Sequence, residues 1–300
     1  MDGILNIYKE KGFTSHDVVA VVRKTLHMKK VGHTGTLDPD AEGVLPICVG
    51  KATKLADIVM DGRKTYRAVL HLGVTTTTED ASGEVVAEKP VAFEEEKIRQ
   101  VIKSFIGELE QIPPMYSAVK INGKKLYELA RAGKEVERKA RRITVYDIRI
   151  LRFLPPCQVE IDVDCSKGTY IRTLCADIGQ VLGYGGHMAG LLRTKTGDFA
   201  LENAMKLGVL KALVEEGQAE TALLGMEEAL QGYPKAVVSE EARKLLYNGG
   251  KIRRDFFCIE NMPEVGQMVT VFDHEKNLVG IYHIVQEEKS FFIKPFKMLI

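Results

Sequence analysis

The chain has 300 residues, of which 45% are hydrophobic and 28% are charged, and its formal net charge is +1. These values are those of an ordinary globular protein, and they exclude a disordered, collagenous or uniformly basic chain. No apolar run approaches the roughly 20 residues of a membrane-spanning helix, and the first residues, MDGILNIYKEKG, carry charges where a signal peptide has an apolar core. We therefore expect a cytoplasmic protein, and any contact with nucleic acid has to come from a local basic patch.

The five cysteines are widely spaced and contain no C-x-x-C pair. No group of Cys and His residues has the ligand spacing of a zinc site. The odd number of cysteines fits a reducing compartment better than a disulfide framework. The sequence therefore predicts no bound metal.

Residues 4–26, ILNIYKEKGFTSHDVVAVVRKTL, are predicted to form a strand, a glycine turn and a helix. Either Thr14 or Ser15 can cap this helix, because both hydroxyl side chains can accept a hydrogen bond from a free backbone N–H of the first turn. The helix places four apolar side chains on one face: Val18, Val21, Val22 and Leu26.

Residues 32–46, GHTGTLDPDAEGVLP, contain three glycines and two prolines. Such a segment cannot form a regular helix, and it is too interrupted for a central strand. We expect a shaped loop that brings His33 close to the carboxylates of Asp38, Asp40 and Glu42. Shaped loops on rigid scaffolds often carry functional groups.

Three simpler explanations of this loop can be tested against its residues: a calcium-binding loop, a nucleotide-binding P-loop and a structural turn. A calcium loop that began at Asp38 would need a bidentate Glu at its twelfth position, where the chain has Val49. The glycines also lack the spacing of a nucleotide-binding P-loop. A structural turn stays open, because Asp before Pro is a common turn residue.

The next elements are a predicted strand at 66–74, a turn-rich connection to another short strand, and a helix over 94–107 that ends at Gly107. Residues 113–142 begin with a proline pair and then become strongly basic. From residue 120 onward only Glu128, Glu135 and Glu137 oppose nine basic side chains: Lys120, Lys124, Lys125, Arg131, Lys134, Arg138, Lys139, Arg141 and Arg142. This charge run predicts either an RNA-binding surface or an ordinary solvated face.

Strands are predicted to resume at 143–153 and 157–174. Tyr170 and Arg172 lie two positions apart in the second of these strands, so both are expected to face the same side of a sheet. A helix and a glycine-rich turn are expected through 183–197, and a helical segment over about 200–235. Short β-like runs then predict a small β-rich domain at 236–300.

Several blocks together resemble the TruB family, the tRNA pseudouridine-55 synthases. In chain order they are LNIYKEKGFTSHDV, GHTGTLDPDAEGVLPICVGKATKL, KTYRAVLHLG, TEDASGEV, QIPPMYSAVKINGKKLYELARAG, CSKGTYIRTL and GYGGHMAGLLRTKTG. They cover about the first 200 residues in the order typical of the family. Glu10 stands where the family often has Pro, and Glu42 where it often has Thr; neither is a catalytic position.

The resemblance implies an α+β pseudouridine-synthase fold, with a large mixed, mainly antiparallel sheet flanked by helices and a small β-rich, PUA-like C-terminal domain. It implies a catalytic domain at 1–235 with a mobile basic thumb at about 113–142. It also implies a PUA-like RNA-binding domain at 236–300 that grips the acceptor-stem side of tRNA. The chain is expected to act as a monomer, without a cofactor.

The implied function is conversion of a uridine to pseudouridine at position 55, in the T loop of tRNA. By motif position, Asp38 is the catalytic carboxylate, and an ionised carboxylate suits a step in which a cationic sugar is stabilised or trapped. The uracil must leave the base stack to be reached. The resemblance implies that His33 fills the opened RNA loop, that Tyr66 packs against the flipped uracil, and that Leu191 lines the uracil pocket.

Of Tyr170 and Arg172, one is expected to contact the substrate while the other pairs with Asp38, which would lower the pKa of the carboxyl group and keep it ionised. Each of these residues also has an ordinary structural explanation, such as a turn for His33 or a core position for Tyr66 and Leu191. Two other functions stay open. One is a non-catalytic tRNA-binding or folding module, and the other is a nucleosidase that hydrolyses the same bond.

Overall fold

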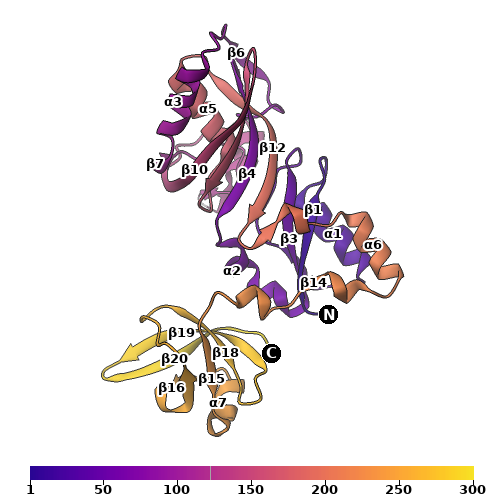
Figure 1. Cartoon of the computed structure of the whole chain (residues 1–300), viewed down its shortest axis with the longest axis vertical. Coiled ribbons are helices and arrows are strands. Elements are labelled where there is room, and N and C mark those ends of the chain that lie inside the picture. Colours follow the sequence, from indigo (N-terminus) through magenta and orange to yellow (C-terminus); the bar gives the residue numbers. More distant parts are fainter. Residues whose placement is uncertain (122) are drawn as a thin grey trace.

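The computed structural model describes residues 1–121 and 123–300. Figure 1 shows an elongated molecule, with a large sheet and its helices at one end and a smaller, separate sheet formed by the C-terminal residues at the other. The large sheet has ten strands and is antiparallel except where β3 pairs with β12. The predicted α+β architecture with a mixed, mainly antiparallel sheet is confirmed.

The main path of the large sheet runs through eight strands in this order: β14 (Leu223–Leu224), β1 (Gly3–Lys9), β3 (Glu42–Val49), β12 (Gly186–Thr196), β4 (Lys64–Leu72), β11 (Gln158–Cys165), β10 (Arg141–Leu154) and β7 (Gly107–Gln111). Two short strands lie off this path: β2 (Val31–His33) pairs with β3, and β13 (Phe199–Ala200) pairs with β12. Two small hairpins are formed by β5 (Val74–Thr76) with β6 (Val85–Glu88), and by β8 (Lys120–Ile121) with β9 (Lys124–Lys125).

The helices associated with this part of the chain are α1 (Ser15–Thr25), α2 (Ala56–Met60), α3 (Glu95–Ser104), α4 (Leu126–Arg131), α5 (Ile171–Leu182) and α6 (Leu207–Glu215). In Figure 1, α3 and α5 lie together beside one half of the sheet, and α1 and α6 lie beside the other half. Helix α1 is capped by Thr14, which bonds reciprocally with Asp17 in a capping box. Buried Val18, Val22 and Leu26 on this strand-turn-helix unit pack into the main core.

The expected loop over 32–46 is wrong at both ends, because residues 32–33 belong to β2 and residues 42–46 belong to β3 in the middle of the sheet. Pro46 is tolerated there because of where it lies. On one edge β3 pairs with β12 at Glu42 and Gly43, and with β2 only from Ile47 onward. Pro46 falls between these two pairings, where no strand requires the N–H that proline lacks.

Three further expectations are wrong. Residues 186–196 form the long central strand β12 and not a glycine-rich turn, and the helical content of 200–235 is confined to α6 and short 3₁₀ turns. Strand β11 ends at Cys165, so Tyr170 and Arg172 are not in a strand. The periodicity of Ile171, Leu174, Cys175 and Ile178 is helical, and these residues form the buried face of α5.

The C-terminal sheet has six strands in the order β16 (Ile252–Arg253), β20 (Ser290–Met298), β19 (Leu278–Glu287), β18 (Met268–Phe272), β15 (Lys235–Val238) and β17 (Phe257–Ile259), and it is accompanied by α7 (Arg243–Tyr247). It has its own apolar core around Leu246, Val271 and Tyr282. A smaller cluster of Leu55, Leu230, Ile281 and Leu299 joins it to the rest of the chain.

Candidate active site

The segment 34–41 connects β2 to β3. Along one edge β3 pairs first with β12 and then with β2, and the segment leaves the sheet between these two partners. Ser15 at the start of α1 holds this segment through Leu37, whose N–H donates to Ser15 Oγ (2.9 Å) and whose carbonyl accepts from it (3.2 Å). Gly12 N–H donates to the carbonyl of Pro39 (2.9 Å). The segment that carries Asp38 is therefore fastened to the N-terminal strand-turn-helix unit.

Lys9 adds a second anchor that the sequence analysis did not identify. Its side chain is completely buried, and its ammonium group donates to the carbonyl oxygens of Ala41 (2.5 Å) and Pro39 (3.0 Å). Burial lowers the pKa of Lys9 to about 8, although the nearby carboxylates of Glu42 and Asp38 act in the opposite direction. The pattern L-x-I-x-K at the N-terminus is the sequence signal for this contact.

Asp38 lies at the centre of a charged bridge. Its carboxylate accepts a hydrogen bond from Arg172, and the same guanidinium group pairs with Asp80 at 3.3 Å. The side chain of Arg172 is only 8% exposed and that of Asp80 is 14% exposed, whereas the Asp38 side chain is 41% exposed. A buried cation thus holds a carboxylate that solvent can reach.

Asp80 was not among the expected site residues, although it belongs to the quoted TEDASGEV block. One of its carboxylate oxygens accepts hydrogen bonds from Thr78 Oγ1 (2.7 Å) and Ser82 Oγ (2.6 Å). Its other oxygen is left for Arg172. This arrangement orients the guanidinium group from the side opposite Asp38.

Arg172 lowers the pKa of Asp38, as expected from the ion pair, but the net direction of the pKa is upward. Burial raises the pKa of this carboxyl group above its ordinary value, Arg172 opposes that rise, and the negative charge of Asp80 adds to it. The net direction is upward because desolvation of the charged form outweighs the ion pair. Arg172 does pair with Asp38, as expected, and it limits the rise in pKa.

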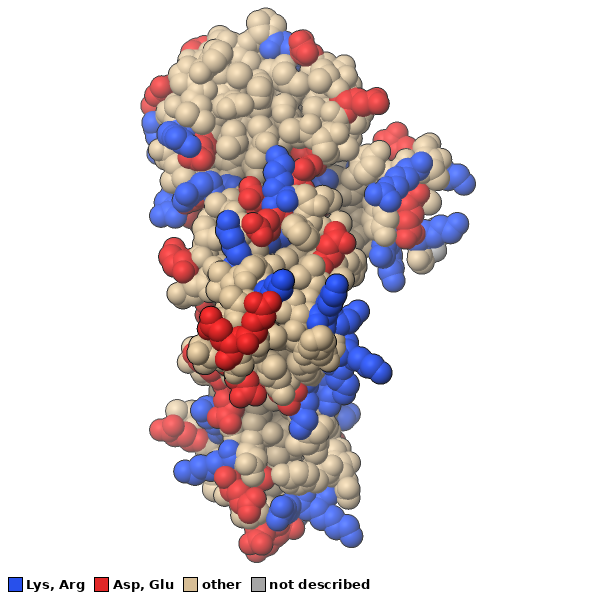
Figure 2. All heavy atoms as spheres, turned by 90° about the vertical axis from the view of Figure 1, so that its right-hand side faces the viewer, with Lys and Arg blue, Asp and Glu red and all other residues tan. Residues whose placement is uncertain are grey.

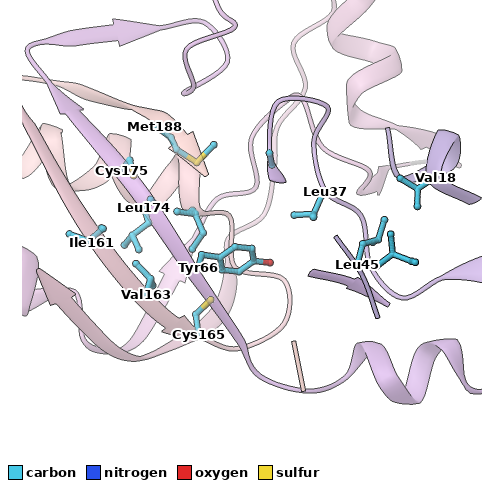
Figure 3. Packing of buried hydrophobic residues seen from close by; sticks show 14 of the residues in the cluster. Val18, Leu37, Leu45, Tyr66, Ile161, Val163, Cys165, Leu174, Cys175 and Met188 are labelled. Atoms are coloured by element: carbon cyan, nitrogen blue, oxygen red, sulfur yellow. The ribbon is translucent and has the colours of Figure 1, made fainter. Parts of the chain in front are cut away.

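Tyr66 and Arg193 lie opposite each other on β4 and β12. Figure 3 shows the Tyr66 ring extending from the sheet toward the segment that carries Leu37. Burial raises the pKa of the Tyr66 hydroxyl, and Arg193 opposes this effect. Arg193 is buried, donates from Nε to the Val44 carbonyl at 2.7 Å, and was missed by the sequence analysis.

The close approach of β12 also requires a glycine in β3. Gly43 has φ of +106°, and a Cβ atom at this position would lie 2.2 Å from the carbonyl oxygen of Arg193. A larger residue would force β3 and β12 apart at the position where they meet Tyr66.

The other expected residues surround this centre. Leu191 pairs with Ala68 on β4 and packs against the main core next to Tyr66. His33 ends β2, and its ring meets the ring of His16 edge-on at 5.2 Å between centroids. Burial and the neighbouring His16 lower the pKa of His33, which favours its neutral form.

Tyr170 occupies the N-cap position of α5, two residues before Arg172. Its peptide groups are held by Gln111 at the end of β7: the Tyr170 N–H donates to Gln111 Oε1 (2.8 Å), and Gln111 Nε2 donates to the Tyr170 carbonyl (3.0 Å). Both functional residues of the CSKGTYIRTL block are therefore positioned by the start of a helix.

The basic insertion leaves the sheet after Gln111 and returns at Arg141, which lies opposite Gln111 in the β7–β10 pair. It contains the β8–β9 hairpin and α4, and Leu126 is its buried apolar anchor. Figure 2 shows one face of the molecule, with a run of Lys and Arg side chains along the right-hand side of its middle part and a group of Asp and Glu side chains to the left of it. Such a charge distribution is suited to a nucleic-acid backbone.

Within residues 1–121 and 123–300, no three His, Cys, Asp or Glu side chains are arranged to hold a metal ion. None of the helices in this described part of the chain is both long and apolar enough to cross a membrane.

Comparison with known proteins matches residues 23–171 to the family model described as "TruB family pseudouridylate synthase (N terminal domain)". Residues 172–231 match the model described as "tRNA pseudouridylate synthase B C-terminal domain". A tRNA pseudouridine synthase B of Alkaliphilus oremlandii is 52% identical over 288 residues, which cover 96% of this chain and 94% of the relative. That of Halalkalibacterium halodurans is 44% identical over 305 residues, covering 100% of this chain and 98% of the relative.

Solved structures agree with these matches. The structure described as "Crystal Structure of a Cbf5-Nop10-Gar1 Complex" is similar with a TM-score of 0.78 and 30% identity, covering 99% of this chain and 85% of that one. The structure described as "Structure of H/ACA RNP bound to a substrate RNA containing 2'-deoxyuridine" gives a TM-score of 0.76 with 28% identity, at the same coverage. Sequence and fold agree, and the chain belongs to the TruB family of pseudouridylate synthases.

Proposed function

We propose that this chain isomerises the uridine at position 55, in the T loop of tRNA, and that Asp38 is its catalytic carboxylate. Family membership makes the chain a tRNA uridine-to-pseudouridine isomerase. The position of the uridine, the extrusion of its base and the role of each residue are the finer parts of the proposal.

The observation that carries the proposal is the accessible carboxylate of Asp38, which is paired with the buried guanidinium group of Arg172 and whose charge acts on the hydroxyl of the buried Tyr66. In the reaction, the bond between ribose carbon 1′ and uracil N1 breaks, and a bond forms between carbon 1′ and uracil carbon 5. The carbon 5 proton leaves and N1 regains a proton, so atoms and electrons balance without an oxidant or a hydrolytic water. An anionic oxygen near carbon 1′ stabilises or traps the cationic sugar that forms in between.

The surrounding groups have separate roles in this proposal. Tyr66 and Leu191 offer a ring and an apolar side chain to the flipped uracil, and the neutral ring of His33 fills the space left in the RNA loop. Tyr170 contacts the substrate, while Arg172 orients Asp38.

We further propose that the chain divides into a catalytic domain at 1–235, with the basic insertion at 113–142 as its mobile thumb, and a PUA-like RNA-binding domain at 236–300. The two apolar cores and the charge of the insertion support this division. The chain acts as a monomer in this proposal.

The test is nucleotide-resolution mapping of pseudouridine in unmodified tRNA treated with the wild-type chain or with Asp38→Asn. The wild type should convert position 55 alone. Asp38→Asn should still bind tRNA, because the amide keeps the shape of the side chain, but its product formation should fall by at least about 10³-fold, since the reactive anion is gone. Conversion by the variant at the wild-type rate would refute the assignment of Asp38.

The same experiment separates the two remaining functions. A nucleosidase would release free uracil and leave an abasic ribose, and a non-catalytic binding module would leave the RNA unchanged. The intact group of Asp38, Arg172 and Tyr66 favours the isomerase over the binding module.

A further inference from the structure

Gln111 joins two parts of the molecule that are far apart in the sequence. Its side chain is 4% exposed, and both ends of its amide bond to the peptide groups of Tyr170. The Tyr170 carbonyl also accepts the N–H of Leu174 at 3.1 Å, so it belongs to the first turn of α5. Two residues later the same turn carries Arg172, whose guanidinium group holds Asp38.

Gln111 is also the last residue of β7 before the basic insertion. The exit segment continues through Pro113 and Pro114, whose rings restrict φ and stiffen the backbone. The returning segment is tied to the exit segment, because Arg138 Nη1 donates to the carbonyl of Pro113 at 3.1 Å. A movement of the insertion therefore reaches the sheet at its two ends, Gln111 and Arg141, which lie opposite each other.

We propose that Gln111 is a positioning residue that couples the base of the basic insertion to the first turn of α5. When RNA binds the insertion, this amide holds Tyr170, and through it Arg172, in register with Asp38. The inference rests on the proposed function and adds a physical link between RNA binding and the alignment of the catalytic carboxylate. Small movements are sufficient for such a link, since a displacement of about 1 Å at a reacting group can lower a rate by about 100-fold.

The first experiment compares Gln111→Met with Gln158→Met. Methionine has a similar length to glutamine but makes neither amide hydrogen bond. Gln158 lies on β11 of the same sheet and bonds only to the His71 ring among the described side chains, so it is a matched control. Gln111→Met should lower the single-turnover rate by about 10- to 100-fold while the Kd for tRNA changes by less than about 3-fold, and Gln158→Met should leave both unchanged.

A general loss of structure would change the single-turnover rate and the Kd for tRNA together. Circular dichroism with thermal melting checks that both variants fold. A wild-type rate for a folded Gln111→Met would overturn the proposal. Gln111→Glu provides a second variant, because its carboxylate still accepts the Tyr170 N–H but repels the Tyr170 carbonyl. It should show the same selective loss of rate.

The second experiment uses the wild-type chain and needs no substitution. Amide hydrogen exchange is measured with and without tRNA in the insertion and at Tyr170. Binding should slow exchange in both places, because the Tyr170 N–H donates to the Gln111 amide. Slowing in the insertion with no change at Tyr170 would overturn the coupling. Failure of the wild type to form pseudouridine would instead refute the proposed function, so the two failures are distinguishable.

Discussion

Asp38 lies where opposing influences act on the pKa of its carboxyl group. Burial and Asp80 raise the pKa, and Arg172 lowers it. In the proposed mechanism the carboxylate acts only in its ionised form, so activity should be present above this pKa and should be lost as the pH falls through it. Arg172 therefore serves both to orient the carboxylate and to extend the pH range in which it is charged.

Replacing Arg172 separates these two effects. Arg172→Met removes the positive charge, so the acid limb of the single-turnover rate should move to higher pH, and the plateau rate should fall by about 10²- to 10³-fold because the carboxylate loses its partner. Arg172→Lys keeps the positive charge but does not bridge the carboxylates of Asp38 and Asp80. The acid limb of its pH–rate profile should therefore stay near that of the wild type, while its plateau rate should fall. An unchanged acid limb and plateau in a folded Arg172→Met would contradict the role of this pair.

At the scale of elements, the site is assembled from segment 34–41, from the ends of α1, β2, β3 and α5 that border it, and from β4 and β12. The basic insertion is different, because it is joined to the sheet through one strand pair and has a small apolar anchor of its own at Leu126. Its contribution to RNA binding should therefore be mainly electrostatic, and the rigid site should be little affected by changes in its surface charge.

The exposed Lys134 and Lys139 allow this to be measured. The double variant Lys134→Gln, Lys139→Gln should bind tRNA more weakly at low salt. The slope of log K against log salt should become shallower by about 0.7 to 0.9 for each phosphate that the variant no longer neutralises. The rate at saturating tRNA should not change. Lys103→Gln on α3 is the control, and an identical salt slope for the control and the double variant would show that the insertion does not bind phosphates.

At the scale of the whole molecule, the C-terminal sheet is attached beside α2, which leads directly into β4 and Tyr66. Lys54 Nζ donates to the carbonyl of Met298 (2.6 Å), Lys297 Nζ donates to the carbonyl of Lys54 (2.7 Å), and Lys297 also pairs with Asp57. These contacts surround the apolar junction that contains Leu299. The C-terminal part is therefore expected to stabilise the segment that leads into Tyr66.

Leu299→Ala tests this junction. Leu299 is 1% exposed, so its truncation should lower the free energy of unfolding by about 2 to 4 kcal/mol, as measured by urea denaturation. Leu245→Ala, at a 45% exposed position of α7, should cost less than about 1 kcal/mol. Equal losses in the two variants would mean that the junction makes no special contribution to stability.

Much of the fold could be predicted from local patterns. Periodicity and end signals predict a helix capped by Thr14 or Ser15, a strand at 66–74 and a helix over 94–107, and the structure has them at Ser15–Thr25, Lys64–Leu72 and Glu95–Ser104. Their apolar faces are set by nearest neighbours in the chain. Strand β12 was missed because its glycines indicate a turn, and Pro46 was misjudged because it was not known which strand borders it. Pairing between distant strands decides both cases.

The sequence by itself determined the family and the mixed sheet architecture, and it singled out Asp38 and Arg172 as the proposed site residues, because these depend on residue types in a recognisable order. Only the tertiary structure decided that Arg172 acts from the first turn of a helix, that Asp80 and Lys9 support the site, and that burial raises the pKa of Asp38. The physical reason is that desolvation, ion pairing and hydrogen-bond geometry depend on distances between segments that the chain brings together only when it folds.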